Sequence, residues 1–269
     1  MTMAAGTECY NADVAPITAR GAMYTEAELD EALKTSVVSI IWDEPGAVDL
    51  RAILSSLVTT DFSEESVKRI LSNQTTPENW RVGEGLAEGF LTEHRNCEFP
   101  WPAGRDLRNP RSSPAGTDLV GFQKCNGAVD SWRFAFGEVK TSKQKAWPPA
   151  VVDGRCGLAE QIEGLRNTPN VKDNLVKYLC YHAQDADWDS HYREAARRYL
   201  VNPNDISLFG VLVRDVEPKT EDLSKRATDL ASGCPAETSI ELRAMYFPEN
   251  TIDSLAERAV RIRDNHANN

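Results

Sequence analysis

The sequence lacks several features that would place it in common protein classes. It has no hydrophobic run long enough to cross a membrane, and its first ten residues lack the basic and apolar segments of a signal peptide. Its six cysteines form no C-x-x-C pair, and its four histidines form no H-x-x-x-H pair. We therefore expect a cytoplasmic protein whose cysteines are reduced packing residues, with neither a disulfide framework nor a zinc site.

Positive charge is also scarce. The chain has 30 Lys and Arg residues against 41 Asp and Glu residues, a net charge of −11 and a pI near 5.0. Because phosphate contacts dominate nucleic-acid affinity, a nucleic-acid enzyme of this charge would need local basic patches or a partner that delivers the substrate. Three clusters are candidates for such patches, although each also fits an ordinary solvated face: Arg105, Arg108 and Arg111; Lys143 and Lys145; Arg193, Arg197 and Arg198.

The patterns that are present predict an α/β protein. With 269 residues, 41% of them hydrophobic, the chain suits one or two globular domains. We expect an accessory or docking region over residues 1–75 and a main domain over 76–269. The first region is predicted to hold helices over 25–33, 47–58 and 63–72 and a strand over 37–42. The second is predicted to hold helices over 80–93, 158–167, 171–184, 189–200, 220–232 and 251–265, and strands over 98–101, 118–122, 132–140, 206–216 and 239–247.

The stretch 116–142 departs from ordinary strand patterning, because charged residues adjoin two apolar runs. In the second run an aromatic residue occupies every second position from Trp132 to Phe136, which is the period-2 pattern of a half-buried strand. The same alternation places Glu138 and Lys140 on the aromatic face. Burying a carboxylate and an ammonium together is costly unless they pair or hold a metal. This conflict indicates a functional site.

Asp118 opens the first apolar run, 118–122. Between the two runs, Asn126-Gly127 is a strong signal for a hairpin turn. An antiparallel pair closed at this turn brings the start of the first strand close to the end of the second. We therefore expect Asp118 to face Glu138 and Lys140.

These residues suit metal-dependent phosphodiester chemistry. Asp118 and Glu138 supply the hard oxygen ligands that Mg²⁺ or Mn²⁺ prefers, and the carbonyl of Val139 is a further ligand. Such an ion lowers the pKa of a bound water and stabilises the charge that develops on a phosphodiester. Lys140 is placed to orient that water or to neutralise the oxyanion.

The same residues carry a resemblance to a known family. Asp118, followed after a hairpin-length gap by Glu138-Val139-Lys140, resembles the D…(E)-x-K signature of the PD-(D/E)xK nuclease superfamily. Within it, the stretches G-T-D-L-V-G-F and G-E-V-K-T-S are similar to the HamA family, the nuclease subunits of Hachiman antiphage defence systems. The resemblance covers roughly residues 80–215, and it departs from the superfamily name at Thr117, where Pro is usual.

The resemblance implies a restriction-endonuclease-like core over 76–269, a mixed central sheet flanked by helices. It also implies two further site residues. A helix before the hairpin often supplies another acidic ligand, for which Glu84 is our choice and Glu88 the alternative. Several members carry a Gln on the helix after the E-x-K motif, and Gln161 resembles it. The implied function is a DNA nuclease held by a helicase partner and released upon invasion.

Other interpretations stay open. A second E-x-K copy at Glu217-Pro218-Lys219 shows that the motif alone is weak, and Pro218 suits a solvated strand end there. The chain would alternatively be a non-catalytic interaction subunit that keeps a nuclease-like fold. A third interpretation is a hydrolase of a phosphorylated metabolite, but the sequence has no glycine-rich phosphate loop, G-x-S-x-G elbow or dinucleotide fingerprint to support it.

Overall fold

The computed structural model describes residues 3–59, 61–71, 76–102, 105, 116–125 and 131–267. Its centre is a seven-stranded mixed sheet in the order β1-β2-β7-β6-β5-β4-β3. The strands are β1 (Thr7–Asn11), β2 (Thr18–Met23), β3 (Cys97–Glu98), β4 (Leu119–Lys124), β5 (Trp132–Ser142), β6 (Ile206–Arg214) and β7 (Ser239–Tyr246). The predicted α/β class is confirmed.

Parallel pairing holds the middle of the sheet together. β6 lies between β5 and β7 and is parallel to both, and β2 is parallel to β7. The outer pairs β1/β2, β3/β4 and β4/β5 are antiparallel. All nine residues of β6 are buried, as expected for a parallel strand that is covered on both faces.

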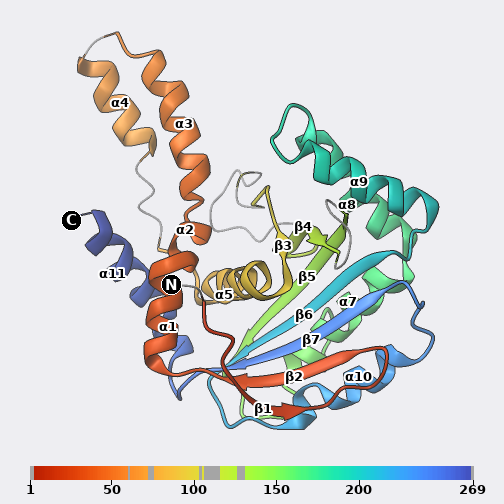
Figure 1. Ribbon diagram of the computed structural model, residues 1–269. Helices are drawn as coiled ribbons and strands as arrows, with labels where there is room; N and C mark the ends of the chain where they lie inside the picture. The colour runs from red at the N-terminus through yellow and green to blue at the C-terminus, as the bar shows by residue number, and fades with distance from the viewer. Residues whose placement is uncertain are drawn as a thin grey trace.

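Helices cover both faces of the sheet (Figure 1). The first face packs against α1 (Glu26–Ala32), the π-helical turn η1 (Leu33–Val37), α2 (Val38–Ile41), α5 (Asn79–Arg95) and α11 (Leu255–Ala267). The second packs against α6 (Ala150–Asp153), α7 (Leu158–Asn167), α8 (Pro169–Ala183), α9 (Asp189–Val201) and α10 (Ser224–Ala231). Two 3-10 turns, η3 (Thr220–Asp222) and η4 (Ile252–Ser254), precede α10 and α11.

The first predicted helix is confirmed, and its start has the expected cause. The side chain of Thr25 accepts from the backbone of Glu28, while the Glu28 carboxylate accepts from the backbone of Thr25, which makes a complete capping box. No described helix has the length and apolar character needed to cross a membrane.

The strand predicted over 37–42 is wrong. The chain continues from α1 through the turn η1 into α2, so this segment is helical. Its β-branched residues favour a strand locally, but Leu29, Leu33 and Val37, spaced four apart, are all fully buried in the core around α5. Burial of this helical stripe overrides the weak β-propensity.

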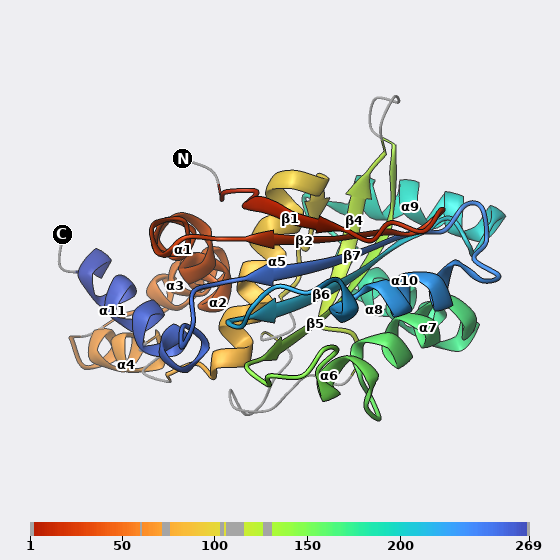
Figure 2. The same cartoon turned by 90° about the horizontal axis from the view of Figure 1, so that it is seen from below.

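The range 1–75 is more closely integrated with the sheet than its sequence indicates. It contributes β1 and β2, which continue the sheet beyond β7. By contrast, α3 (Glu44–Ser56) and α4 (Asp61–Leu71) project away from the body, as Figures 1 and 2 show. α3 has no buried residue, and its Val48, Ile53 and Leu57 are 64%, 61% and 70% exposed.

Gly121 allows β3 to approach β4, and its replacement tests that packing. A Cβ atom at Gly121 would lie 2.0 Å from the carbonyl oxygen of Glu98. We expect Gly121→Ala to lower the free energy of unfolding by about 1–3 kcal/mol. Gly164 in α7 is the matched control, because nothing lies within 4 Å of its Cβ position. Gly164→Ala should raise stability by about 0.5–1 kcal/mol. Urea titration measures both, and an unchanged midpoint for Gly121→Ala would contradict this packing.

Candidate active site

Asp118 and Glu138 face each other where β4 begins. Leu119 pairs with Gly137 in the antiparallel register, so the preceding residue, Asp118, lies opposite Glu138. The backbone N–H of Val139 donates to Asp118 Oδ2 at 2.7 Å. By the same register Val139 would otherwise meet Thr117, so the carboxylate takes the place of a backbone acceptor. The predicted pairing is confirmed, while the Asn126-Gly127 turn lies outside the described residues.

Lys140 completes this cluster. Its Nζ donates to Glu138 Oε1 at 2.6 Å, as expected for residues two apart on one strand face. The Glu138 side chain is only 2% exposed, whereas that of Lys140 is 22% exposed. The ammonium thus contacts both the buried carboxylate and the surface.

The two carboxyl groups are held in unfavourable surroundings. Burial, followed by the charge of Asp118, raises the pKa of Glu138 to about 8, although Lys140 opposes the shift. Burial likewise raises the pKa of Asp118, against the Val139 N–H and the Lys140 charge. Opposing carboxylates in a dry site favour a proton or a cation between them.

The backbone adds a third oxygen to this position. N–H and C=O of one strand residue point to the same side, so the Val139 carbonyl points toward β4, like its N–H. In the part of the chain that the structure describes, no group of three or more His, Cys, Asp and Glu side chains is arranged to hold a metal ion. Mg²⁺, however, usually binds through one or two carboxylates and keeps several waters, which suits this donor set.

Of the two candidate glutamates on α5, Glu84 is electrostatically connected to the pair. Glu84 is 4% exposed, and burial followed by the charge of Asp118 raises its pKa to about 7. Burial also raises the pKa of Glu88 to about 7, but its acidic neighbour is Asp43. The geometry therefore favours Glu84.

Arg81 was missed by the sequence reasoning. Its guanidinium donates to Glu84 Oε2 at 2.7 Å, and its charge lowers the pKa of Glu84, Glu88 and Asp118. The signal was the spacing of three residues between Arg81 and Glu84 on a helix.

The glycines of α5 have a packing explanation. They reduce helix propensity, which the sequence alone associates with function. A Cβ at Gly83 would lie 2.1 Å from Thr141 Oγ1 on β5, and one at Gly85 would lie 3.0 Å from Val37. The glycines thus let α5 approach the sheet and bring Glu84 to the strand that carries Glu138.

Gln161 lies on the helix that covers the Glu138 side of the sheet. Gly210 of β6 is beside Glu138 in register, and its Cβ position lies 3.5 Å from both Leu158 and Ile162 of α7. Gln161 is next to Ile162, and its Oε1 is buried without a hydrogen-bond partner among the described residues. The structure gives no direct contact between Gln161 and the carboxylates.

The basic clusters expected near the site are largely compensated. Lys143 pairs with Asp253 at 2.6 Å and Lys145 with Glu249 at 2.7 Å, both on the surface. The other described members also have acidic partners: Arg105 pairs with Asp43, Arg193 with Asp189, Arg197 with Glu194 and Arg198 with Asp205. Arg108 and Arg111 lie outside the described residues.

The second E-x-K copy differs from the first in exposure. Glu217 and Lys219 are 76% and 39% exposed, and their charged atoms are 3.9 Å apart beyond the end of β6. This is the solvated strand end that the sequence predicts. Burial and the facing Asp118 therefore distinguish Glu138-Val139-Lys140 from its copy.

Comparison with known proteins adds no assignment. No protein-family model matches this chain, and no curated protein matches it. The functional interpretation therefore depends on the residues and their geometry.

The raised pKa of Glu138 predicts a pH-dependent stability. The folded protein binds this proton more tightly than the unfolded chain, so the stability it contributes is full below about pH 4.5 and is lost as pH rises through about 8. Without divalent ions, Glu138→Gln should therefore be more stable than the wild type at pH 8, on the order of 2 kcal/mol, and similar near pH 4.5.

Chemical denaturation in EDTA at both pH values measures this difference. The exposed Glu163→Gln is the control and should show no such pH dependence, since the Glu163 side chain is 61% exposed. A wild type that is more stable than Glu138→Gln at pH 8 would show that Glu138 is not strained in its ionised form.

Proposed function

We propose that this chain is a metal-dependent nuclease of the PD-(D/E)xK type that hydrolyses phosphodiester bonds in DNA. The observation that carries the proposal is the buried pair Asp118 and Glu138, with Lys140 bonded to Glu138 at 2.6 Å. A structural ion pair would need one carboxylate for one ammonium. Here two buried carboxylates share one, which leaves negative charge for a cation to neutralise.

The donor set fits Mg²⁺ or Mn²⁺. Asp118, Glu138 and the Val139 carbonyl would hold one or two such ions, and Glu84 would add a carboxylate from α5. When bound, the ion lowers the pKa of a water molecule and stabilises charge on the phosphate. Ionisation of Glu138, whose pKa is about 8, is favoured by that cation.

The protein side chains divide the remaining work. Lys140 is partly exposed and can donate to the attacking water or to the phosphate oxygens, because its ammonium reaches the surface from the buried carboxylate. Arg81 keeps Glu84 in place by an ion pair of 2.7 Å. Gln161, with an unused buried oxygen, would assist by orienting a water or a substrate group.

At the level of the cell, we propose a role in antiphage defence like that of the HamA family, with a helicase partner controlling the nuclease. The acidic net charge of −11 supports dependence on a partner, since the chain alone has little attraction for DNA. The pairing of Lys143 and Lys145 with carboxylates strengthens that argument.

A non-catalytic interaction subunit is the second candidate. The observation that favours it is the projecting pair α3 and α4, whose exposed apolar side chains include Val48, Ile53 and Ile70. Such side chains are common in protein interfaces. An interaction role alone, however, gives no reason to bury Asp118 beside Glu138.

A cleavage assay tests the nuclease directly. Plasmid and linear DNA are incubated with Mg²⁺ or Mn²⁺, with and without the candidate helicase. We expect Asp118→Asn, Glu138→Gln and Lys140→Ala each to lower the cleavage rate by at least about 100-fold, because each removes charge at the reacting phosphate. EDTA should abolish cleavage.

The second E-x-K copy provides matched controls. Glu217→Gln and Lys219→Gln make the same chemical changes at the surface and should leave cleavage unchanged. If no condition yields cleavage while the Glu138 and Lys140 variants still protect cells from phage, the interaction-subunit interpretation takes its place.

A further inference from the structure

A separate cavity lies at the other end of β4 and β5, where the C-terminus of α5 meets them. It has a volume of about 340 Å³ and is lined by His94, Arg95, Asn96, Gln123, Lys124, Cys125, Arg133 and Arg198. Arg133 precedes Glu138 by five residues on β5, a separation of about 17 Å along the strand. The cavity is therefore distinct from the carboxylate site.

The lining of this cavity is basic in an acidic protein. Four of its residues are Arg or Lys, a fifth is His, and none is Asp or Glu. The whole chain, by contrast, has a net charge of −11. Positive side chains gathered in a concave site favour an anionic ligand.

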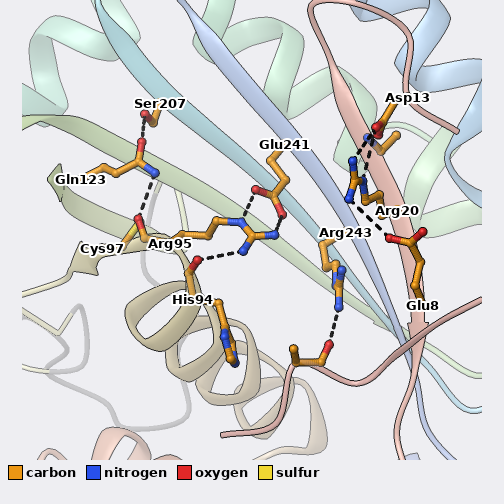
Figure 3. Close-up of polar contacts among 12 residues, drawn as sticks. Glu8, Asp13, Arg20, His94, Arg95, Cys97, Gln123, Ser207, Glu241 and Arg243 are labelled. Carbon is orange, nitrogen blue, oxygen red and sulfur yellow. Dashed lines mark hydrogen bonds and ion pairs between the residues drawn. The ribbon is translucent and has the colours of Figure 1, made fainter. Parts of the chain in front are cut away.

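Two of the arginines are already neutralised. Arg95 forms a bidentate pair with Glu241, at 2.5 and 2.7 Å, and Arg198 pairs with Asp205 at 2.7 Å. Figure 3 shows the Arg95–Glu241 pair at the sheet beside Gln123. These two contacts fix the wall of the cavity.

Arg133 keeps an uncompensated charge. Its guanidinium donates to the neutral Oε1 of Gln123, at 2.9 and 3.3 Å. Gln123 is itself held by Ser207, at 2.5 Å, and by the backbone carbonyl of Arg95, at 3.0 Å, as Figure 3 shows. Arg133 is thus oriented by a fixed amide, and no carboxylate contacts it in the described part of the chain.

Lys124 supplies a second free charge. It is directly opposite Trp132 in the β4/β5 register, and its Nζ lies 5.9 Å from the centre of the Trp132 ring. It has no ion pair with any described carboxylate. Arg133 follows Trp132 in β5, so the two uncompensated cations come from adjacent positions of the paired strands.

We propose that this cavity binds a phosphate group, held by Arg133 and Lys124. A guanidinium matches the geometry of phosphate oxygens, and a lysine adds a mobile point charge. The volume is at the lower end of ligand pockets, which suits a phosphate with one attached nucleoside. The phosphate belongs either to the backbone of a nucleic-acid strand or to a free nucleotide. The proposal does not depend on catalysis at Glu138.

Binding is measured on the full chain in EDTA, so that no divalent ion contributes. The probes are a fluorescein-labelled 20-nucleotide single strand, followed by anisotropy, and AMP and inorganic phosphate, followed by calorimetry. We expect Arg133→Gln and Lys124→Gln each to weaken binding of the probe that the wild type binds by about tenfold. For the strand, the slope of log affinity against log salt should fall by about 0.7 per lost contact.

Arg197→Gln is the matched control, because Arg197 lies beside Arg198 on α9 but outside the cavity and is paired with Glu194. It should bind like the wild type, and so should Glu138→Gln, which separates this test from that of the nuclease. Strand binding that requires Arg133 identifies a substrate-backbone site, and AMP binding that requires Arg133 identifies a nucleotide site. If the wild type binds none of the probes, or if the cavity variants bind as the wild type does, the proposal is wrong.

Discussion

The burial of two facing carboxylates is the constraint around which the site is built. Asp118 and Glu138 lie opposite each other at the start of β4, where burial raises the pKa of both. The surrounding structure offsets this cost in three ways: the Val139 N–H donates to Asp118, Lys140 pairs with Glu138, and Arg81 pairs with Glu84. These contacts leave more buried acid than base, which is a good reason to expect a cation there.

Much of this site could be predicted from the sequence, because its signals are local. Period-2 alternation placed Glu138 and Lys140 on one strand face, and the hairpin pattern placed Asp118 opposite them. Helix α7 was also predicted with its observed bounds, Leu158–Asn167. Such patterns involve residues that are neighbours along a strand, across a short hairpin or around one helix.

The parts that could not be predicted depend on contacts between distant segments. The segment 37–42 has strand-like composition but is helical, because its apolar stripe packs against α5. The glycines of α5 indicated function, whereas Gly83 is explained by the close approach of Thr141. Lys143 looked like a free basic residue until Asp253, far along the chain, was placed beside it. A charge run in sequence does not show which charges remain uncompensated in the fold.

The most direct test of the central claim is a titration of the protein with Mn²⁺, followed by electron paramagnetic resonance of the free ion. We predict that the wild type binds one or two ions at pH 7.5 and that Asp118→Asn and Glu138→Gln lose this binding, while Glu217→Gln retains it. Absence of binding in the wild type, or equal binding in all four proteins, would contradict the assignment of Asp118 and Glu138 as a metal site.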